Sequence, residues 1–244
     1  MTTQLRKSSK AAAKSNSTMI QKYECGFCKA KFQRESTLGT HICVRKRRHL
    51  EIDSIASRFG FRAFQRFYDI STVCKKTKTI EEFIESDYYI QFVKFGHHLA
   101  ALRPVYPDQF IDFIIRNGIK LKDWTTDYVY YAYVDDLVKR EPAIAAIDRS
   151  IGTMMEWATA NNVEFVKFFS MVSPNEASSM IQTGKISPWV LYLSSSAGVL
   201  MNAFNGDHVK IIGSIIDAVF WMKKFKKNSD EVIYIRDLLT QAGL

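Results

Sequence analysis

Apolar residues recur every three or four positions over most of the chain beyond residue 49, a spacing typical of α-helices with one buried face. The series begins with Leu50, Ile52, Ile55, Ala56 and Phe59. This region contains no run of alternating β-branched residues separated by hairpin turns. The pattern therefore predicts an all-α domain over residues 50–244, built from roughly eight to ten helices.

Short motifs predict where some of these helices begin and end. Thr79 and Glu82 form a capping box, which opens a helix expected to continue through Phe95. Ser173 and Ser187 each precede a proline, the order expected for an N-cap followed by the first helical residue. Further helices are expected near 124–139, 142–160, 188–204, 207–226 and 229–242.

An aromatic-rich segment lies in the middle of this region. Trp124, Tyr128 and Tyr131 are spaced to share one face of the helix expected near 124–139. Such rings could stack on the bases of a single nucleic-acid strand. Core packing explains them more simply, and we expect this face to be buried.

The positive charge is confined to the N-terminal fifth of the chain. The net charge is +9, yet residues 1–50 hold 12 Lys and Arg against 2 acidic residues, and the remainder is nearly neutral. Residues 1–21 are rich in Ser, Thr, Ala and Lys without apolar periodicity, which predicts a disordered basic tail. Residues 45–49 form a second basic segment, predicted to be a linker. A confined basic region of this kind is typical of proteins that bind phosphates.

Between these basic segments, Cys25 and Cys28 are separated by two residues, so a tight turn can direct both thiolates at one point. His41 and Cys43 follow at a distance that suits two further ligands. Phe32 and Leu38 are the apolar residues that so short a module can pack around a metal, since it has almost no core of its own.

This pattern over residues 22–44 resembles a C2H2 zinc finger, with cysteine as the last ligand. The resemblance implies a small ββα module that holds one structural Zn²⁺ through Cys25, Cys28, His41 and Cys43. Residues two apart lie about 200° around a helix, so the helix must end or tighten right after His41 for Cys43 to reach the metal. His49 is the alternative fourth ligand. The whole chain also loosely resembles small zinc-finger accessory proteins of tailed phages.

The same resemblance places three residues at the positions that face bases in DNA-reading fingers: Arg34, Thr37 and Thr40. One finger covers only about 3 base pairs. Most of the affinity would therefore come from phosphate contacts of the basic segments, chiefly Arg45, Lys46, Arg47 and Arg48. These residues favour a nucleic-acid partner, expected to be duplex DNA bound with weak sequence specificity, although RNA remains an alternative.

The leading hypothesis is a non-enzymatic, zinc-containing nucleic-acid-binding accessory protein, whose helical domain docks an unidentified partner protein. A protein-interaction adaptor with a structural finger is the second hypothesis. A small metal-dependent nuclease is the third, with Asp135, Asp136, Asp217 and Glu231 as candidate carboxylates. No phosphate-binding glycine loop, nucleophile elbow or kinase motif is present.

Two further features bear on the compartment. No apolar run reaches the ~18 residues needed to cross a bilayer, so no membrane partner is expected. Cys74 is left without a second cysteine once the metal set is formed, which favours a reducing compartment over a disulfide framework. We therefore expect the cytoplasm of a bacterial or phage-infected cell, or the nucleus if the host is eukaryotic.

Overall fold

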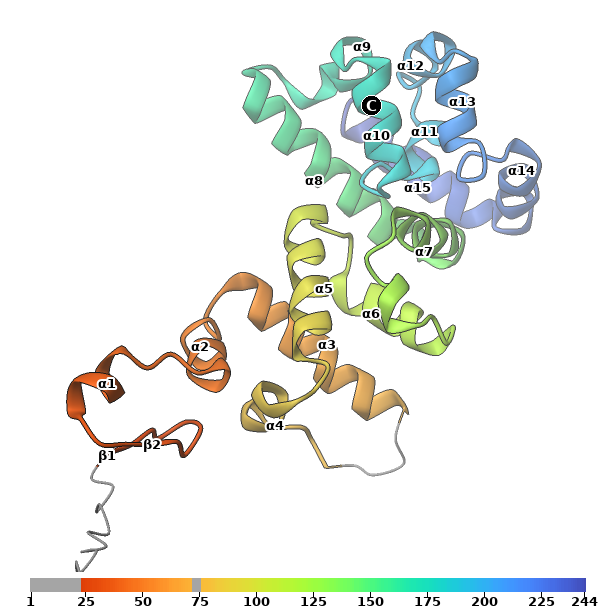
Figure 1. The fold of residues 1–244 in the computed structure, drawn as a ribbon. Helices are drawn as coiled ribbons and strands as arrows, with labels where there is room; N and C mark the ends of the chain where they lie inside the picture. Colours follow the sequence, from red (N-terminus) through yellow and green to blue (C-terminus); the bar gives the residue numbers. More distant parts are fainter. Residues whose placement is uncertain (1–22, 72–75) are drawn as a thin grey trace, which may run out of the picture. The chain divides into compact units, whose positions relative to one another are not determined.

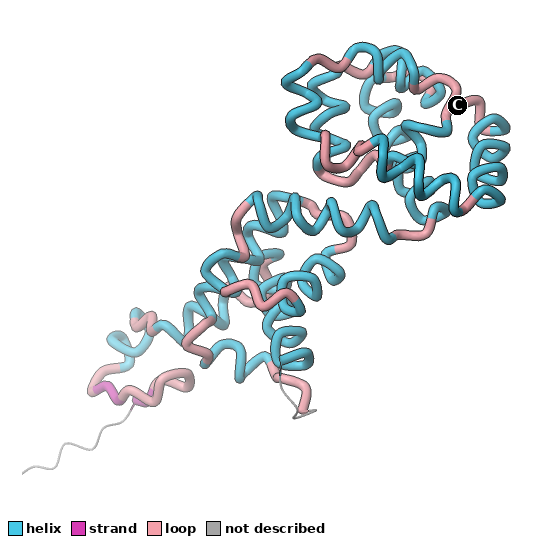
Figure 2. Tube along the Cα trace, turned by 90° about the vertical axis from the view of Figure 1, so that its right-hand side faces the viewer, coloured by secondary structure: helices cyan, strands magenta, loops and turns pink. Residues whose placement is uncertain are grey.

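The computed structural model describes residues 23–71 and 76–244, and it confirms a mainly α fold with a small strand region near the N-terminus (Figures 1 and 2). Within the described residues there are 15 α-helices and one two-stranded sheet. The chain divides into two compact units, Met1–Ile52 and Asp53–Leu244, here called the N-terminal unit and the helical unit. The predicted tail and Cys74 lie outside the described residues.

The N-terminal unit contains a hairpin followed by two short helices. Strands β1 (Tyr23–Glu24) and β2 (Lys31–Phe32) pair antiparallel, with Tyr23 opposite Phe32. Helix α1 (Glu35–Thr40) follows, and helix α2 (Val44–Leu50) completes the unit. The predicted ββα order of the module is therefore present.

The segment predicted as a linker is instead helical. Residues 45–49 lie inside α2, whose N-cap is Cys43. Two contacts hold α2 against the turn between the strands: Arg45 Nη1 donates a hydrogen bond of 3.4 Å to the Phe27 carbonyl, and the Phe27 and His49 rings lie 5.0 Å apart. The helical unit also begins later than predicted, because Leu50 ends α2 and the next helix starts at Ile55.

The helical unit begins with five α-helices and one short 3₁₀ helix. In chain order these are α3 (Ile55–Ser71), α4 (Ile80–Glu85), α5 (Tyr89–Leu102), α6 (Pro107–Arg116), η1 (Leu121–Asp123) and α7 (Asp127–Arg140). Helices α3 and α5 approach very closely, since a Cβ atom on Gly96 would lie 1.9 Å from the Ala56 carbonyl oxygen. Phenylalanine rings pack around this crossing, with Phe92 and Phe95 against Trp124.

The second half of the helical unit opens with the long helix α8 and continues mostly with short helices. They are α8 (Ala143–Asn161), η2 (Phe165–Lys167), α9 (Phe168–Met171), α10 (Pro174–Gln182), α11 (Pro188–Leu193), α12 (Gly198–Ala203), α13 (Gly206–Ile212), α14 (Ala218–Lys227) and α15 (Ser229–Gln241). A second aromatic cluster joins α11 to α14, with Trp189 and Trp221 6.0 Å apart.

The predicted caps are confirmed, but the predicted number of helices was too low. Thr79 and Glu82 form the capping box, and Ser173 and Ser187 each cap a helix that begins with proline. The helix expected from Thr79 through Phe95 is broken at residues 86–88, where the Ser86 hydroxyl accepts a hydrogen bond from the Tyr88 backbone. The expected helices 188–204 and 207–226 are likewise each split in two.

The prediction that the aromatic residues Trp124, Tyr128 and Tyr131 share one buried helix face was also wrong. Trp124 is buried but lies ahead of α7, while Tyr128 is 80% exposed. The buried tyrosines of α7 are Tyr130 and Tyr133, whose hydroxyls reach the backbone ahead of α6: Val105 N–H donates to Tyr130 at 3.2 Å, and Tyr133 donates to the Val105 carbonyl at 2.8 Å.

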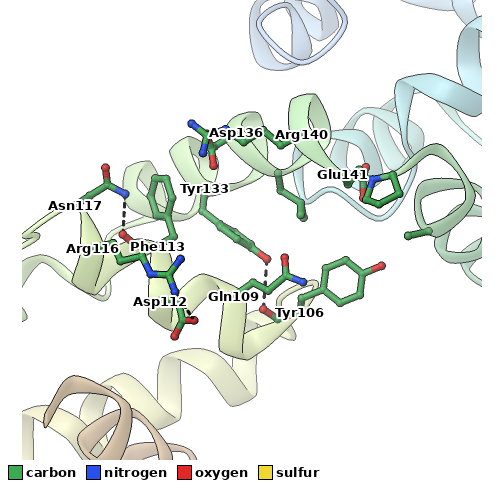
Figure 3. A pocket seen from close by; sticks show the side chains of 13 residues that line it. Tyr106, Gln109, Asp112, Phe113, Arg116, Asn117, Tyr133, Asp136, Arg140 and Glu141 are labelled. Atoms are coloured by element: carbon green, nitrogen blue, oxygen red, sulfur yellow. Dashed lines mark hydrogen bonds and ion pairs between the residues drawn. The ribbon is translucent and has the colours of Figure 1, made fainter. Parts of the chain in front are cut away.

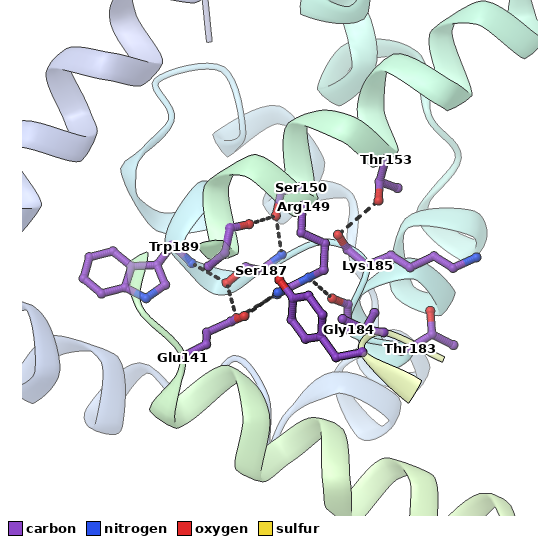
Figure 4. Close-up of polar contacts among 12 residues, drawn as sticks. Glu141, Arg149, Ser150, Thr153, Thr183, Gly184, Lys185, Ser187 and Trp189 are labelled. Carbon is purple, nitrogen blue, oxygen red and sulfur yellow. Dashed lines mark hydrogen bonds and ion pairs between the residues drawn. The ribbon is translucent and has the colours of Figure 1, made fainter. Parts of the chain in front are cut away.

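A buried ion pair joins the two halves of the helical unit (Figure 4). Glu141, just after α7, binds Arg149 of α8 through both carboxylate oxygens, and the two side chains are 2% and 10% exposed. Arg149 Nε also donates to the Gly184 carbonyl at 2.7 Å, and Ser187 donates to Glu141 at 3.4 Å. These bonds satisfy both charges, which keeps the cost of burying the pair low.

In the part of the chain that the structure describes, every helix is too short or too polar to cross a membrane.

Candidate metal centre

The hairpin and the end of α1 position the candidate ligands of the N-terminal unit. Cys25 directly follows β1, and its N–H donates to the Ala30 carbonyl at 2.9 Å. The Lys29 N–H donates back to the Cys25 carbonyl at 2.9 Å, with Lys29 in the left-handed conformation (φ 62°). This tight turn folds Cys28 back toward Cys25.

The other two ligands come from the point where α1 ends. The helix stops at Thr40, and His41 is extended, with φ −69° and ψ 119°. Cys43 is also extended and caps α2, with its sulfur accepting a hydrogen bond of 3.3 Å from the Lys46 N–H. The predicted end of the helix before Cys43 is therefore confirmed. The helix ends at Thr40, one residue earlier than the predicted end at His41.

The four predicted ligands lie together. One ligand atom from each of Cys25, Cys28, His41 and Cys43 lies within 4.8 Å of the other three. The Cys28 sulfur and His41 Nε2 are 3.3 Å apart, and Cys25 is buried while the other three are half-buried. Such a Cys and His cluster can hold a metal ion. His49, the alternative fourth ligand, lies outside this cluster, against Phe27.

The surroundings of the cluster shift the pKa values of Cys25 and Cys28 in opposite directions. The Cys28 backbone N–H lowers the pKa of the Cys25 thiol to about 7, in spite of the desolvation of that thiol. The pKa of Cys28 is raised, since desolvation and the neighbouring cysteine thiols outweigh the backbone N–H of Ala30. At Cys43 the sulfur accepts a hydrogen bond from the Lys46 N–H in the first turn of α2.

The predicted nucleic-acid-binding residues occupy both helices of the N-terminal unit. Arg34 is the N-cap residue of α1, and Thr37 and Thr40 are exposed on that helix. The Thr40 hydroxyl donates to the Ser36 carbonyl at 3.2 Å, so its donor is engaged within the helix. Base reading by Arg34, Thr37 and Thr40 stays a prediction.

Among the basic residues of α2, the exposure differs. Arg45 and Arg47 are exposed, whereas Lys46 and Arg48 are half-buried. Lys46 Nζ donates to the His41 carbonyl at 3.3 Å, and its backbone N–H binds the Cys43 sulfur. Lys46 therefore braces the two ligands, a role that sequence reasoning missed because it depends on how α2 folds back.

Three of the carboxylates considered for a nuclease take part in separate structural contacts. Asp135 pairs with Lys139 at 2.7 Å and Asp136 with Arg140 at 2.8 Å, each one helical turn apart. Asp217 caps α14. Within the described residues, the cysteine and histidine cluster is the one group of potential ligands close enough to hold a metal ion.

No protein-family model matches the chain, and neither a curated protein nor a solved structure does. The resemblance to C2H2 fingers therefore depends on the residues and their geometry alone. The likeness to phage accessory proteins and the expected compartment remain predictions.

Proposed function

We propose that this protein is a non-enzymatic, zinc-containing nucleic-acid-binding accessory protein. The observation that carries the proposal is the four-ligand cluster of Cys25, Cys28, His41 and Cys43 beside the exposed arginines of the N-terminal unit. The N-terminal unit would contact duplex DNA, and the helical unit would dock a protein partner.

Zinc fits the donor set and its spacing. Three thiolates and one imidazole form a standard closed structural zinc set, and tetrahedral bonds of about 2.0–2.3 Å place neighbouring ligand atoms roughly 3.5–3.8 Å apart. The Cys28 to His41 separation of 3.3 Å and the 4.8 Å limit on the cluster bracket these values. One Zn²⁺ would hold the hairpin and both helices together.

The positive surface supports a phosphate-rich partner. Arg34, Arg45 and Arg47 are exposed around the cluster, and the basic residues continue into the tail. Arginine donors match phosphate oxygens and release bound counterions on contact. With Thr40 donating to its own helix, base contacts would be few, so sequence specificity would be weak.

The test is binding of labelled duplex DNA to the full-length protein across a salt series, with zinc per chain measured on the same samples. We expect about one zinc per chain and affinity that falls steeply with salt. Arg34→Ala combined with Arg47→Ala should reduce the salt slope by about 2, since each lost phosphate contact changes it by about 1.

Two controls accompany this experiment. Lys122→Ala removes one exposed charge of the helical unit and should leave the slope unchanged. Cys28→Ser should lose both zinc and duplex binding. If the zinc-loaded protein does not bind duplex DNA at low salt, the nucleic-acid part of the proposal is refuted.

Exposed apolar side chains support a protein partner for the helical unit. Val219 and Met222 are exposed on α14, and Ile233 and Tyr234 on α15, each by more than half of its surface. Apolar groups of this kind gain free energy when a partner covers them.

A specific observation also favours the adaptor as a second function. Ile42 and Val44 flank Cys43 and are 68% and 52% exposed, and Leu50 at the end of α2 is 70% exposed. In an adaptor, the metal would hold these apolar residues in position to contact a partner protein. Binding to a partner protein would then persist in high salt, whereas phosphate binding would not.

A further inference from the structure

The helical unit contains a groove outside the metal centre, between α6 and α7 (Figure 3). It has a volume of about 860 Å³, within the range of ligand sites. Figure 3 shows Phe113 and Arg116 on the α6 side, Asp136 and Arg140 on the α7 side, and the Tyr133 ring extending between the helices.

The two arginines of the groove, Arg116 and Arg140, have N–H donors beyond those that their ion pairs use. Arg116 is paired only loosely with Asp112, at 3.7 Å, because Arg66 already binds both oxygens of that carboxylate at 2.6 Å. A separation of 3.7 Å is too long for a hydrogen bond. Arg140 Nη2 lies 2.8 Å from Asp136 Oδ1, and the Arg140 side chain is 79% exposed.

The acidic residues of the groove are largely neutralised from outside it. Asp112 is bound by Arg66, and Glu141 is bound by the buried Arg149; neither arginine lines the groove. The remaining carboxylate, Asp136, pairs with Arg140, and Arg116 is the second guanidinium group of the lining. The groove therefore presents a net positive charge to a ligand.

Aromatic and amide groups complete the lining. Phe113 and Tyr133 lie with ring centroids 5.7 Å apart, and Gln109 and Asn117 also line the groove. Asn117 Nδ2 donates a hydrogen bond of 2.7 Å to the Phe113 carbonyl (Figure 3). Tyr106, at one end, is held in the left-handed conformation (φ 51°), which non-glycine residues rarely adopt and which clusters at ligand sites.

We propose that this groove binds a nucleotide. The guanidinium groups of Arg116 and Arg140 would hold the phosphate, since their planar forks match its oxygens. The base would lie against the Phe113 ring, and the Gln109 amide and the Asn117 amide oxygen are suited to its polar edge. The ligand can come from two sources, a free mononucleotide or a single nucleic-acid strand. This site is independent of the metal centre and of the duplex binding proposed for it.

The experiment titrates full-length protein with adenosine 5′-monophosphate and with inorganic phosphate by calorimetry. We expect the mononucleotide to bind at least tenfold more tightly than phosphate. Arg116→Ala and Arg140→Ala should each weaken it by about tenfold or more, as expected for a charge-assisted hydrogen bond. Phe113→Leu should weaken the mononucleotide but not phosphate, and Arg236→Ala, an exposed arginine on α15, should change neither.

A short oligo(dA) strand distinguishes the sources. If Arg116→Ala weakens the strand as well, a strand is the ligand; if it weakens only the mononucleotide, the ligand is a free nucleotide. Cys28→Ser should leave mononucleotide binding intact, so failure of the metal centre and failure of this groove are separate results. The proposal is overturned if the mononucleotide does not bind, if inorganic phosphate binds equally well, or if both arginine variants bind the mononucleotide normally.

Discussion

At the scale of single residues, the spacing of His41 and Cys43 decides how the N-terminal unit folds. Residues two apart cannot share a helix face, so a helix through both would direct them away from one metal. The chain ends α1 at Thr40 and uses Cys43 to cap α2. That break follows from helix geometry and could be predicted. The bracing contact of Lys46 could not, because nothing in the sequence fixes the direction of α2.

The fourth ligand gives the first prediction. Cys43→Ser should weaken zinc affinity by about 100-fold. It removes one of the four bonds that together supply an apparent binding free energy of ~10–16 kcal/mol. His49→Ala should leave affinity unchanged, because His49 contacts Phe27 rather than the cluster. Competition with a chromophoric chelator measures both. The opposite order of effects would identify His49 as the ligand.

At the scale of elements, local signals were predicted well and breaks inside helices were not. Thr79, Ser173 and Ser187 act through their own backbone neighbours, so their caps are visible in sequence. The break between α11 and α12 falls at residues 194–197, in a stretch where apolar spacing continues on both sides. At this break the Ser194 hydroxyl accepts a hydrogen bond from the Ser196 N–H at 3.2 Å, a local contact that apolar periodicity does not encode. The groove between α6 and α7 escaped prediction because it depends on how two helices pack.

The α3 and α5 crossing gives the second prediction. Gly96→Ala should destabilise the helical unit by about 3 kcal/mol, because its Cβ atom would collide with the Ala56 carbonyl and force the helices apart. Gly152→Ala is the matched control, since that glycine lies within α8 with open space at its Cβ position. The control should gain about 0.5–1 kcal/mol from helix propensity. Denaturant unfolding of both variants measures the difference. Equal stabilities would show that the crossing is not rigid.

At the scale of the whole molecule, the two units are stabilised by different means. In the described part of the N-terminal unit, Cys25 is the only buried apolar residue, whereas the helical unit has two large aromatic clusters. With so small a core, the module would depend on the proposed metal to fold. The all-α class of the helical unit could be predicted from its apolar periodicity. Its sequence contains no motif that identifies a partner.

This contrast gives the last prediction. Chelation of the metal at neutral pH should unfold the N-terminal unit alone, because the ligands then lose the bonds that offset the entropy of ordering it. Amide resonances of residues 23–52 should collapse to unfolded positions, while those of the helical unit and its melting temperature stay unchanged. Duplex binding should disappear at the same chelator concentration, and Cys28→Ser should reproduce this state without chelator. Melting of both units together would mean that the helical unit depends on the metal as well, and the division at Ile52 would then not be a boundary of stability.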